Sequence, residues 1–111
     1  MGKAAEQIDL AAMQTAAGKA CGMLKVLANP DRLMLLCQLT QGEHCVSELE
    51  AVLGIAQPTL SQQLGVLREE QLVSTRREGK QIYYSIASAE AMAILQVLYA
   101  LFCKPAKGDK R

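Results

Sequence analysis

The chain has 111 residues, half of them hydrophobic and 21% charged, with a formal net charge of +1. This length suits one domain with one core, and no apolar run is as long as the roughly 18 residues needed to span a bilayer. The small net charge excludes a protein that coats nucleic acid by bulk electrostatics. The segment MGKAAEQIDL lacks the continuous apolar core of a secretory signal. We therefore expect a cytoplasmic protein without a membrane partner, in which any contact with DNA is local.

Two helices are predicted in the N-terminal part of the chain. The segment from Ala4 to about Ala28 is rich in alanine and carries apolar residues at helical spacing, which predicts a long first helix. Asn29, Pro30 and Asp31 then supply an N-cap, a suitable first helical residue and an acid for the first turn. A second helix is therefore expected to begin there and to end near Thr40.

Two shorter helices joined by a tight turn are predicted between residues 47 and 70. Gly54 provides the turn, and the second of these helices begins near Gln57, with Pro58 at a position where a missing N–H does no harm. Apolar residues mark the inward faces: Val46, Leu49, Val52 and Leu53 on the first helix, and Leu60, Leu64 and Leu67 on the second. This pattern is typical of a helix-turn-helix.

A β-hairpin is predicted directly after this pair of helices. Apolar and polar residues alternate from Gln81 to Ile86, which indicates a strand with one buried face, and residues 73–77 supply its partner across a turn at Gly79. Three cations suited to DNA phosphates lie at its tip: Arg76, Arg77 and Lys80. Such a hairpin after a helix-turn-helix is a wing, so we predict a mainly α winged helix-turn-helix with the element order ααααββα.

The last predicted helix, from about Ser88 to Cys103, is apolar around nearly its whole circumference. A helix of this kind has to be buried on all sides, and a domain of this size cannot enclose one alone. We therefore expect a homodimer in which the first and last helices pack against a second copy. Residues 104–111 are expected to form a flexible charged tail, so the predicted domain covers residues 4–103.

Polar side chains occupy the second helix of the pair on faces away from its leucines. Glutamine can pair bidentately with adenine, and serine or threonine can contact bases or backbone. With the wing cations they form the candidate DNA-binding set: Gln57, Thr59, Ser61, Gln62, Gln63, Arg68, Arg76, Arg77 and Lys80. A two-fold dimer would present two such helices to major grooves about 34 Å apart on an inverted-repeat operator in double-stranded DNA.

Two alternatives to DNA binding follow from the same residues. The polar side chains could simply solvate an exposed face, in which case the apolar last helix would dock another protein. An enzyme is the least expected class, because the chain has a single histidine, no nucleophile–base pair at recognisable spacing and no phosphate-binding glycine loop. No cofactor is expected.

Two runs of sequence carry a resemblance to a known family. LKVLANPDRLMLLCQL and VSELEAVLGIAQPTLSQQLGVLREEQLVSTRREGKQIYYSI resemble the ArsR/SmtB family of dimeric winged-helix repressors, over nearly the whole chain. GIAQPTLSQQLGVLRE and the two cysteines in LMLLCQL and LYALFCK are most similar to its BigR/SqrR branch, whose members sense reactive sulfur species. The resemblance implies a repressor that leaves its operator when a persulfide or polysulfide oxidises the dithiol of Cys37 and Cys103.

Much of this family binds metals, but the residues at the family's metal positions differ here. A thiolate site after the second helix would need two cysteines one residue apart, whereas Ser47 stands two residues after Cys45. The last helix contains no histidine. Because tetrahedral zinc takes four strong ligands, we expect His44 and Cys45 to lie in a surface turn without a metal. A metal-responsive repressor, or one that binds arsenite through three thiols, is the alternative function.

Cys37 and Cys103 each lie near the carboxyl end of a predicted helix. The helix dipole and apolar surroundings disfavour a thiolate there, so raised pKa values are expected, with persulfides and polysulfides as better oxidants than peroxide. A direct disulfide needs Cα atoms within about 7 Å, and extra sulfur atoms could bridge a longer separation. The alternative for any single cysteine is a role as a small apolar core residue. Cys21 has no identified partner.

Overall fold

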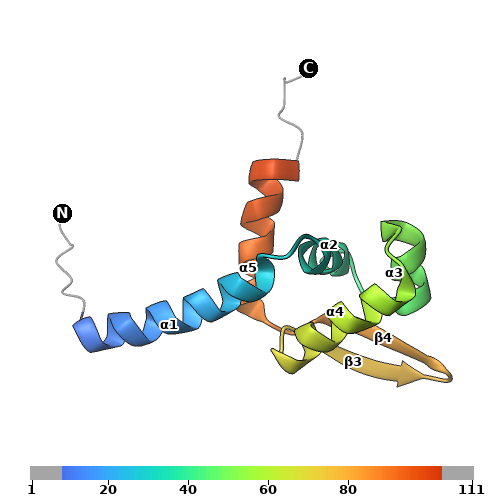
Figure 1. The fold of residues 1–111 in the computed structure, drawn as a ribbon, viewed down its shortest axis with the longest axis horizontal. Helices are drawn as coiled ribbons and strands as arrows, with labels where there is room; N and C mark the ends of the chain where they lie inside the picture. Colours follow the sequence, from blue (N-terminus) through green and yellow to red (C-terminus); the bar gives the residue numbers. More distant parts are fainter. Residues whose placement is uncertain (1–8, 104–111) are drawn as a thin grey trace, which may run out of the picture.

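A computed structural model of the chain describes residues 9–103 and shows a mainly helical domain with a small antiparallel sheet (Figure 1). The elements are, in chain order, α1 (Leu10–Leu27), α2 (Pro30–Leu39), β2 (His44–Cys45), α3 (Val46–Leu53), α4 (Gln57–Glu69), β3 (Val73–Glu78), β4 (Gln81–Ile86), α5 (Ala89–Leu98) and the π-helix η1 (Tyr99–Cys103). The predicted winged helix-turn-helix is confirmed. The predicted order lacked one short strand, β2.

Helix α1 projects from the body of the domain and packs only at its carboxyl end (Figure 1). It begins at Leu10, later than the predicted start at Ala4, because the Asp9 carboxylate caps it and accepts a hydrogen bond from the backbone N–H of Ala11 at 3.3 Å. Val26 and Leu27 are buried, whereas residues 10–22 are exposed. The predicted helical residues 4–8 and the predicted tail 104–111 lie outside the described residues.

Arg32 holds the start of α2 against both α1 and α4. The N-cap is the one predicted, since the Asn29 side chain accepts a hydrogen bond from the backbone N–H of Arg32 at 3.0 Å. The Arg32 guanidinium donates to the Val26 carbonyl at 2.7 Å and to the Gln63 side-chain oxygen at 2.9 Å. These contacts position the helix-turn-helix relative to the arm formed by α1.

The core consists mainly of leucines from α2, α3 and α4. Burial of one such side chain stabilises the fold by roughly 2 kcal/mol, and the fully buried leucines are Leu35, Leu36, Leu49, Leu60, Leu64, Leu67 and Leu95. The three inward leucines predicted for α4 are all among them. The predicted inward position of Val52 is wrong: its side chain is 57% exposed, because it lies beyond the arc of α3 defined by Val46, Leu49 and Leu53, which contact the core.

The wing is a three-stranded sheet in the order β2-β4-β3. Strands β3 and β4 pair antiparallel from Val73 opposite Ile86 to the turn at Gly79. Strand β2 covers the other edge of β4, with Cys45 opposite Tyr83. The expectation that His44 and Cys45 form a surface turn is therefore wrong, because their backbone completes the sheet and Cys45 is only 4% exposed.

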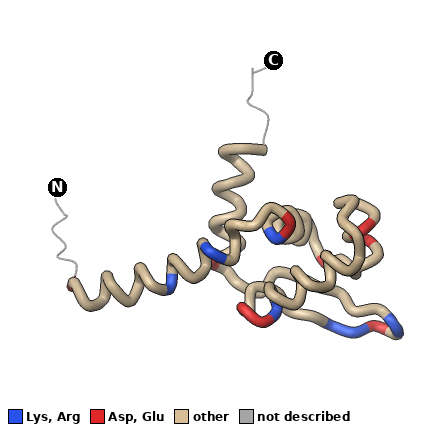
Figure 2. The backbone as a smooth tube through the Cα atoms, viewed as in Figure 1, with Lys and Arg blue, Asp and Glu red and all other residues tan. Residues whose placement is uncertain are grey.

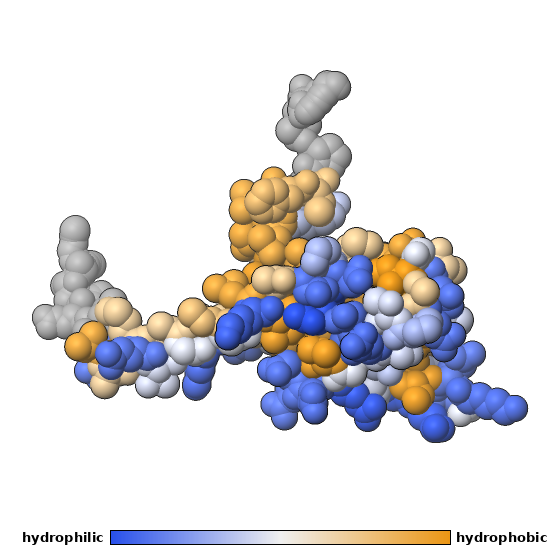
Figure 3. Space-filling view, in the orientation of Figure 1, coloured by the Kyte–Doolittle hydropathy of each residue, from blue (hydrophilic) through white to orange (hydrophobic). Residues whose placement is uncertain are grey.

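The last helix changes from an α-helix to a π-helix after Leu98. Ser88 caps α5 by accepting a hydrogen bond from the Ala91 N–H at 3.0 Å, and the helix continues beyond Leu98 as the wider π-helix η1 rather than as the regular helix expected to Cys103. Only Ala91 and Leu95 are buried. The rest of α5 and η1, which together form a second arm, shows a strongly hydrophobic surface in the single chain (Figure 3). No helix among residues 9–103 is long and apolar enough to cross a membrane.

Candidate functional site

Cys37 and Cys103 line the same groove, which we call the thiol groove. It has a volume of about 590 Å³ and lies between α2, the end of α3 and η1. Its lining residues are Pro30, Leu33, Met34, Cys37, Gln38, Gln41, Leu53, Tyr99 and Cys103. Cys37 comes from the last turns of α2 and is half-buried, and Cys103 ends η1 and is exposed. Both are free thiols, 66 positions apart in the sequence (103 minus 37), that the fold brings to one cavity.

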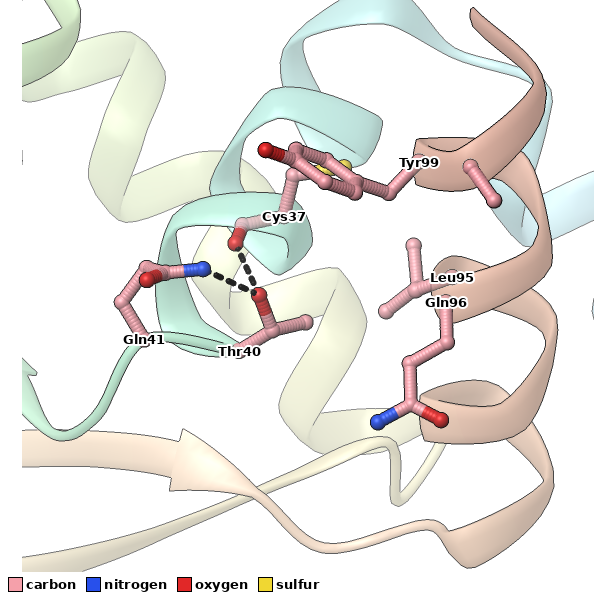
Figure 4. A pocket seen from close by; sticks show the side chains of 7 residues that line it. Cys37, Thr40, Gln41, Leu95, Gln96 and Tyr99 are labelled. Carbon is pink, nitrogen blue, oxygen red and sulfur yellow. Dashed lines mark hydrogen bonds between the residues drawn. The ribbon is translucent and has the colours of Figure 1, made fainter. Parts of the chain in front are cut away.

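A second hollow of about 320 Å³ lies beside Cys37, between the end of α2 and α5. Tyr99 borders both hollows, and its ring reaches from η1 across to Cys37 (Figure 4). The Thr40 hydroxyl donates a hydrogen bond to the Cys37 carbonyl at 2.6 Å and accepts one from the Gln41 amide at 3.2 Å. The backbone of Cys37 is therefore held in place, and this residue borders both hollows.

The surroundings of the thiol groove favour the neutral form of Cys37. Burial raises the pKa of Cys37, and the proximity of the Cys103 sulfur raises it further. The predicted direction is confirmed for Cys37, and the second sulfur adds a contribution that depends on the fold. Among residues 9–103, no charged side chain lines this groove.

The other two cysteines lie in different surroundings. Cys21 is exposed on α1, and Cys45 is sealed in β2 with the Ser47 hydroxyl 3.3 Å from its sulfur. The Cys45 N–H donates to the Glu48 carboxylate at 3.0 Å, which links β2 to the first turn of α3. Within residues 9–103, no three His, Cys, Asp or Glu side chains lie close enough together to hold a metal ion.

The predicted DNA-binding side chains of α4 fall into two groups. Gln57, Ser61, Gln62 and Arg68 are exposed, whereas Thr59 and Gln63 are half-buried. The Gln63 side-chain oxygen already accepts the hydrogen bond from Arg32, which leaves its amide N–H₂ as the group free to turn outward. The signal that the sequence analysis missed is Arg32, a cation in the first turn of α2 that points back to α4.

The wing cations differ in their partners. The Arg76 guanidinium forms ion pairs with Glu43 and Glu78, each at 2.9 Å, and stacks over the Tyr83 ring with 4.9 Å to its centroid. Hydrogen bonding to these carboxylates raises the pKa of Arg76, and the Arg76 contact lowers the pKa of Glu43. Arg77 and Lys80 are exposed and make no ion pair with any described residue.

We call the cluster of Glu43, His44, Cys45, Arg76 and Tyr83 the wing junction. Figure 2 shows basic and acidic residues alternating toward the tip of the wing. Glu43 was not among the predicted site residues, because its pairing with Arg76 depends on β2 lying beside β4, and the sequence does not signal a strand of two residues. At the wing, Arg77 and Lys80 are the more accessible positive charges.

Comparison with known proteins places the chain among bacterial regulators. Residues 29–75 match the family described as bacterial regulatory protein, arsR family. The biofilm growth-associated repressor of Agrobacterium fabrum (strain C58 / ATCC 33970) is 57% identical over 99 residues, which cover 89% of this chain and 85% of that protein.

Two solved structures extend the likeness to the fold. The crystal structure of the transcriptional repressor BigR from Xylella fastidiosa has a TM-score of 0.79 and 48% sequence identity, with 87% of this chain and 99% of that chain covered. The transcriptional regulator HlyU from Vibrio vulnificus CMCP6 has a TM-score of 0.82 and 41% identity, with 86% and 100% covered.

Proposed function

This chain belongs to the ArsR/SmtB family of DNA-binding transcriptional repressors, and from that premise we propose that its repression is controlled by the dithiol of Cys37 and Cys103. In the reduced state the repressor binds its operator. A persulfide or polysulfide joins the two sulfurs by a disulfide or a polysulfide bridge, and the repressor then releases DNA. The observation that carries the proposal is that both free thiols line the thiol groove.

The chemistry can proceed with the groups present. A thiolate of the pair attacks the outer sulfur of a persulfide RSSH and takes it up as a protein persulfide, releasing RSH. The second thiolate attacks the inner, protein-bound sulfur of that persulfide, which closes the Cys37–Cys103 disulfide and releases H₂S. The balanced change is a dithiol plus RSSH giving a disulfide, RSH and H₂S. Two RSSH molecules give a trisulfide bridge, two RSH and one H₂S, with the protein oxidised and the persulfide reduced in both cases.

The DNA-reading surface in this proposal combines α4 with the wing. The exposed side chains Gln57, Ser61 and Gln62 face the major groove, with Thr59 and Gln63 beside them. Arg68, Arg77 and Lys80 contact phosphates, and Arg76 does so once it is released from Glu43.

A second copy of the chain completes the repressor in this proposal. Both arms carry large apolar side chains in contact with water in the single chain, Leu10, Met13 and Leu24 on α1 and Val97, Leu101 and Phe102 on α5 and η1. Burying these arms against each other gives a two-fold dimer with two α4 helices on an inverted repeat. Sedimentation of the reduced protein at micromolar concentration is expected to give the mass of a dimer.

A bridge in the thiol groove alters DNA binding through the arms. It ties the last turns of α2 to η1, and η1 belongs to the arm that meets the second copy. A shift of that arm changes the spacing of the two α4 helices on the operator. A coupling free energy of about 1 to 3 kcal/mol lowers the affinity by roughly 5- to 150-fold.

Operator release under controlled oxidation tests the proposal. Fluorescence anisotropy with a DNA duplex from the promoter of the protein's own gene is measured in reductant and after treatment with glutathione persulfide. The wild-type protein and Cys21→Ser are expected to lose affinity on oxidation, whereas Cys37→Ser and Cys103→Ser are expected to bind DNA equally in both conditions. Oxidation-dependent release by the double variant Cys37→Ser/Cys103→Ser would disprove the proposal.

A further inference from the structure

We propose that the thiol groove selects neutral organic polysulfides with short apolar substituents, such as dialkyl trisulfides, over anionic ones such as glutathione trisulfide. This inference rests on the proposed dithiol function and names the substrate class of the same site. The groove acts in this proposal as a binding site that holds the oxidant beside Cys37 and Cys103 before any bond changes.

The lining of the groove supports a neutral occupant. Besides the two thiols, its walls are made by aliphatic side chains, the Tyr99 ring and the two amides of Gln38 and Gln41. No charged side chain among residues 9–103 lines it. A carboxylate that entered would lose water without gaining an opposite charge from any wall residue of the described segment 9–103, whereas each CH₂ group buried there improves affinity about fourfold.

The size and accessibility of the groove fit a small molecule. Its volume of about 590 Å³ lies within the range of roughly 300 to 1,000 Å³ that is typical of small-molecule sites. Met34, which forms part of the wall, is 42% exposed, so the groove is open to solvent along α2. The alkyl groups can lie along Leu33, Met34 and Leu53 while the sulfur chain faces the thiols.

The reaction balances with a trisulfide as the oxidant. One thiolate of the pair attacks RSSSR, a sulfur–sulfur bond breaks, and either RSH or RSSH leaves after taking up a proton. The second thiolate then displaces the remaining RS group. The dithiol plus RSSSR gives a trisulfide bridge and two RSH, or a disulfide bridge, RSH and RSSH. The protein loses two electrons and two protons in each case, and the polysulfide is reduced.

Occupancy can be measured without chemistry in the Cys37→Ser/Cys103→Ser protein. The methionine methyl groups are labelled with ¹³C, and di-n-propyl trisulfide is titrated into the full-length variant. The Met34 methyl signal is expected to shift in a saturable manner. Met13 is the control for changes outside the groove, because it lies on α1, in the arm that the proposed dimer buries, and does not line the groove. An unshifted Met34 signal, or equal shifts of Met34 and Met13, would overturn the inference.

Selectivity is measured by intact-mass time courses of bridge formation in the reduced wild-type protein. The rate with di-n-propyl trisulfide is divided by the rate with glutathione trisulfide, and the same ratio is measured for N-acetylcysteine amide. The protein ratio is expected to exceed the small-thiol ratio at least about tenfold, since burial of two or more CH₂ groups gives that factor. Equal ratios would refute selection by the groove.

A pair of variants locates the effect. Met34→Gln replaces an apolar wall residue with a neutral polar one and is expected to slow the reaction with di-n-propyl trisulfide severalfold, while the glutathione trisulfide rate stays the same. Val52→Gln makes the same kind of change at an exposed position of α3 outside the groove and is expected to change neither rate. Equal rates for both variants would contradict the assignment. Operator release by glutathione persulfide is scored separately, so the dithiol function can stand if groove selection fails.

Discussion

The thiol groove and the wing junction each contain cysteine sulfur, only eight positions apart at Cys37 and Cys45, yet their surroundings are opposite. The groove is open, apolar and free of charged residues of the described chain. The wing junction is closed by strand pairing, a buried cysteine and an ion pair between Glu43 and Arg76. Position in the fold, and not residue type, therefore decides which sulfur is accessible to a reagent.

The same comparison separates a region that borders two hollows from a region that is held by strand pairing. Cys37 lies in the last turn of α2 and lines both hollows, whereas Cys45 lies opposite Tyr83 in a sheet. In the proposed mechanism, a bridge in the groove shifts the arm formed by α5 and η1, while strand pairing holds the wing.

The largest expected difference is in thiol reactivity. In the folded reduced protein, iodoacetamide is expected to modify Cys103 about 10³-fold faster than Cys45, because Cys45 is 4% exposed and reacts only after an opening that costs about 4 kcal/mol. Peptide mass spectrometry over time measures both rates. In concentrated guanidinium chloride the two rates should converge, and similar rates in the folded protein would show that the wing junction is not closed.

The attachment of β2 to α3 is expected to carry a measurable part of the stability. Glu48→Ala removes the carboxylate that accepts the Cys45 N–H, and the free energy of unfolding in urea is expected to fall by about 1 kcal/mol. Glu48→Gln keeps an acceptor and should lose less. Alkylation of Cys103 should be unchanged in both variants, and a faster reaction there would indicate that the two regions are coupled.

Release of Arg76 from one of its two acidic partners is expected to strengthen DNA binding. Glu43→Gln removes the carboxylate 2.9 Å from the guanidinium, so the affinity for the operator should rise severalfold and the slope of log K against log salt should steepen by up to about 1. Glu50→Gln makes the same charge change on the exposed face of α3 and serves as the control. An equal gain in operator affinity in both variants would show that the change in net charge, and not the release of Arg76, causes the effect.

The smallest expected effect concerns the titration of Cys37. Burial and the Cys103 sulfur both raise the pKa of Cys37, so Cys103→Ser should lower that pKa while leaving it above the ordinary thiol value. The pH profile of Cys37 alkylation measures the change. A thiol with a raised folded pKa stabilises the protein below its unfolded pKa, and that stability is lost as pH rises through the folded value. In Cys103→Ser, this contribution to stability should be lost over a narrower range of pH. An unchanged pH profile of Cys37 alkylation would exclude an interaction between the two sulfurs.

Local patterns in the sequence predicted the helical core and the wing. Asn29 and Pro30 marked the start of α2, and Leu60, Leu64 and Leu67 marked the buried face of α4, because capping and helical periodicity act within a few residues. Helical periodicity gave a wrong prediction at Val52. This residue follows the apolar spacing of α3, but it lies outside the face of that short helix that contacts the core. Strand β2 has two residues, too few for any alternation to appear.

Local sequence patterns were therefore enough to predict the winged helix-turn-helix, the polar face of α4 and the cations of the wing, and family resemblance indicated which two cysteines to consider together. The packing of distant segments was needed to show that Cys37 and Cys103 share one groove, that Cys45 is buried, and that Arg76 and Gln63 have partners in Glu43 and Arg32. The two kinds of information differ in the distance along the chain over which the interactions act. Caps and periodicity depend on neighbours along the chain, whereas grooves, ion pairs and burial depend on which distant segments pack together.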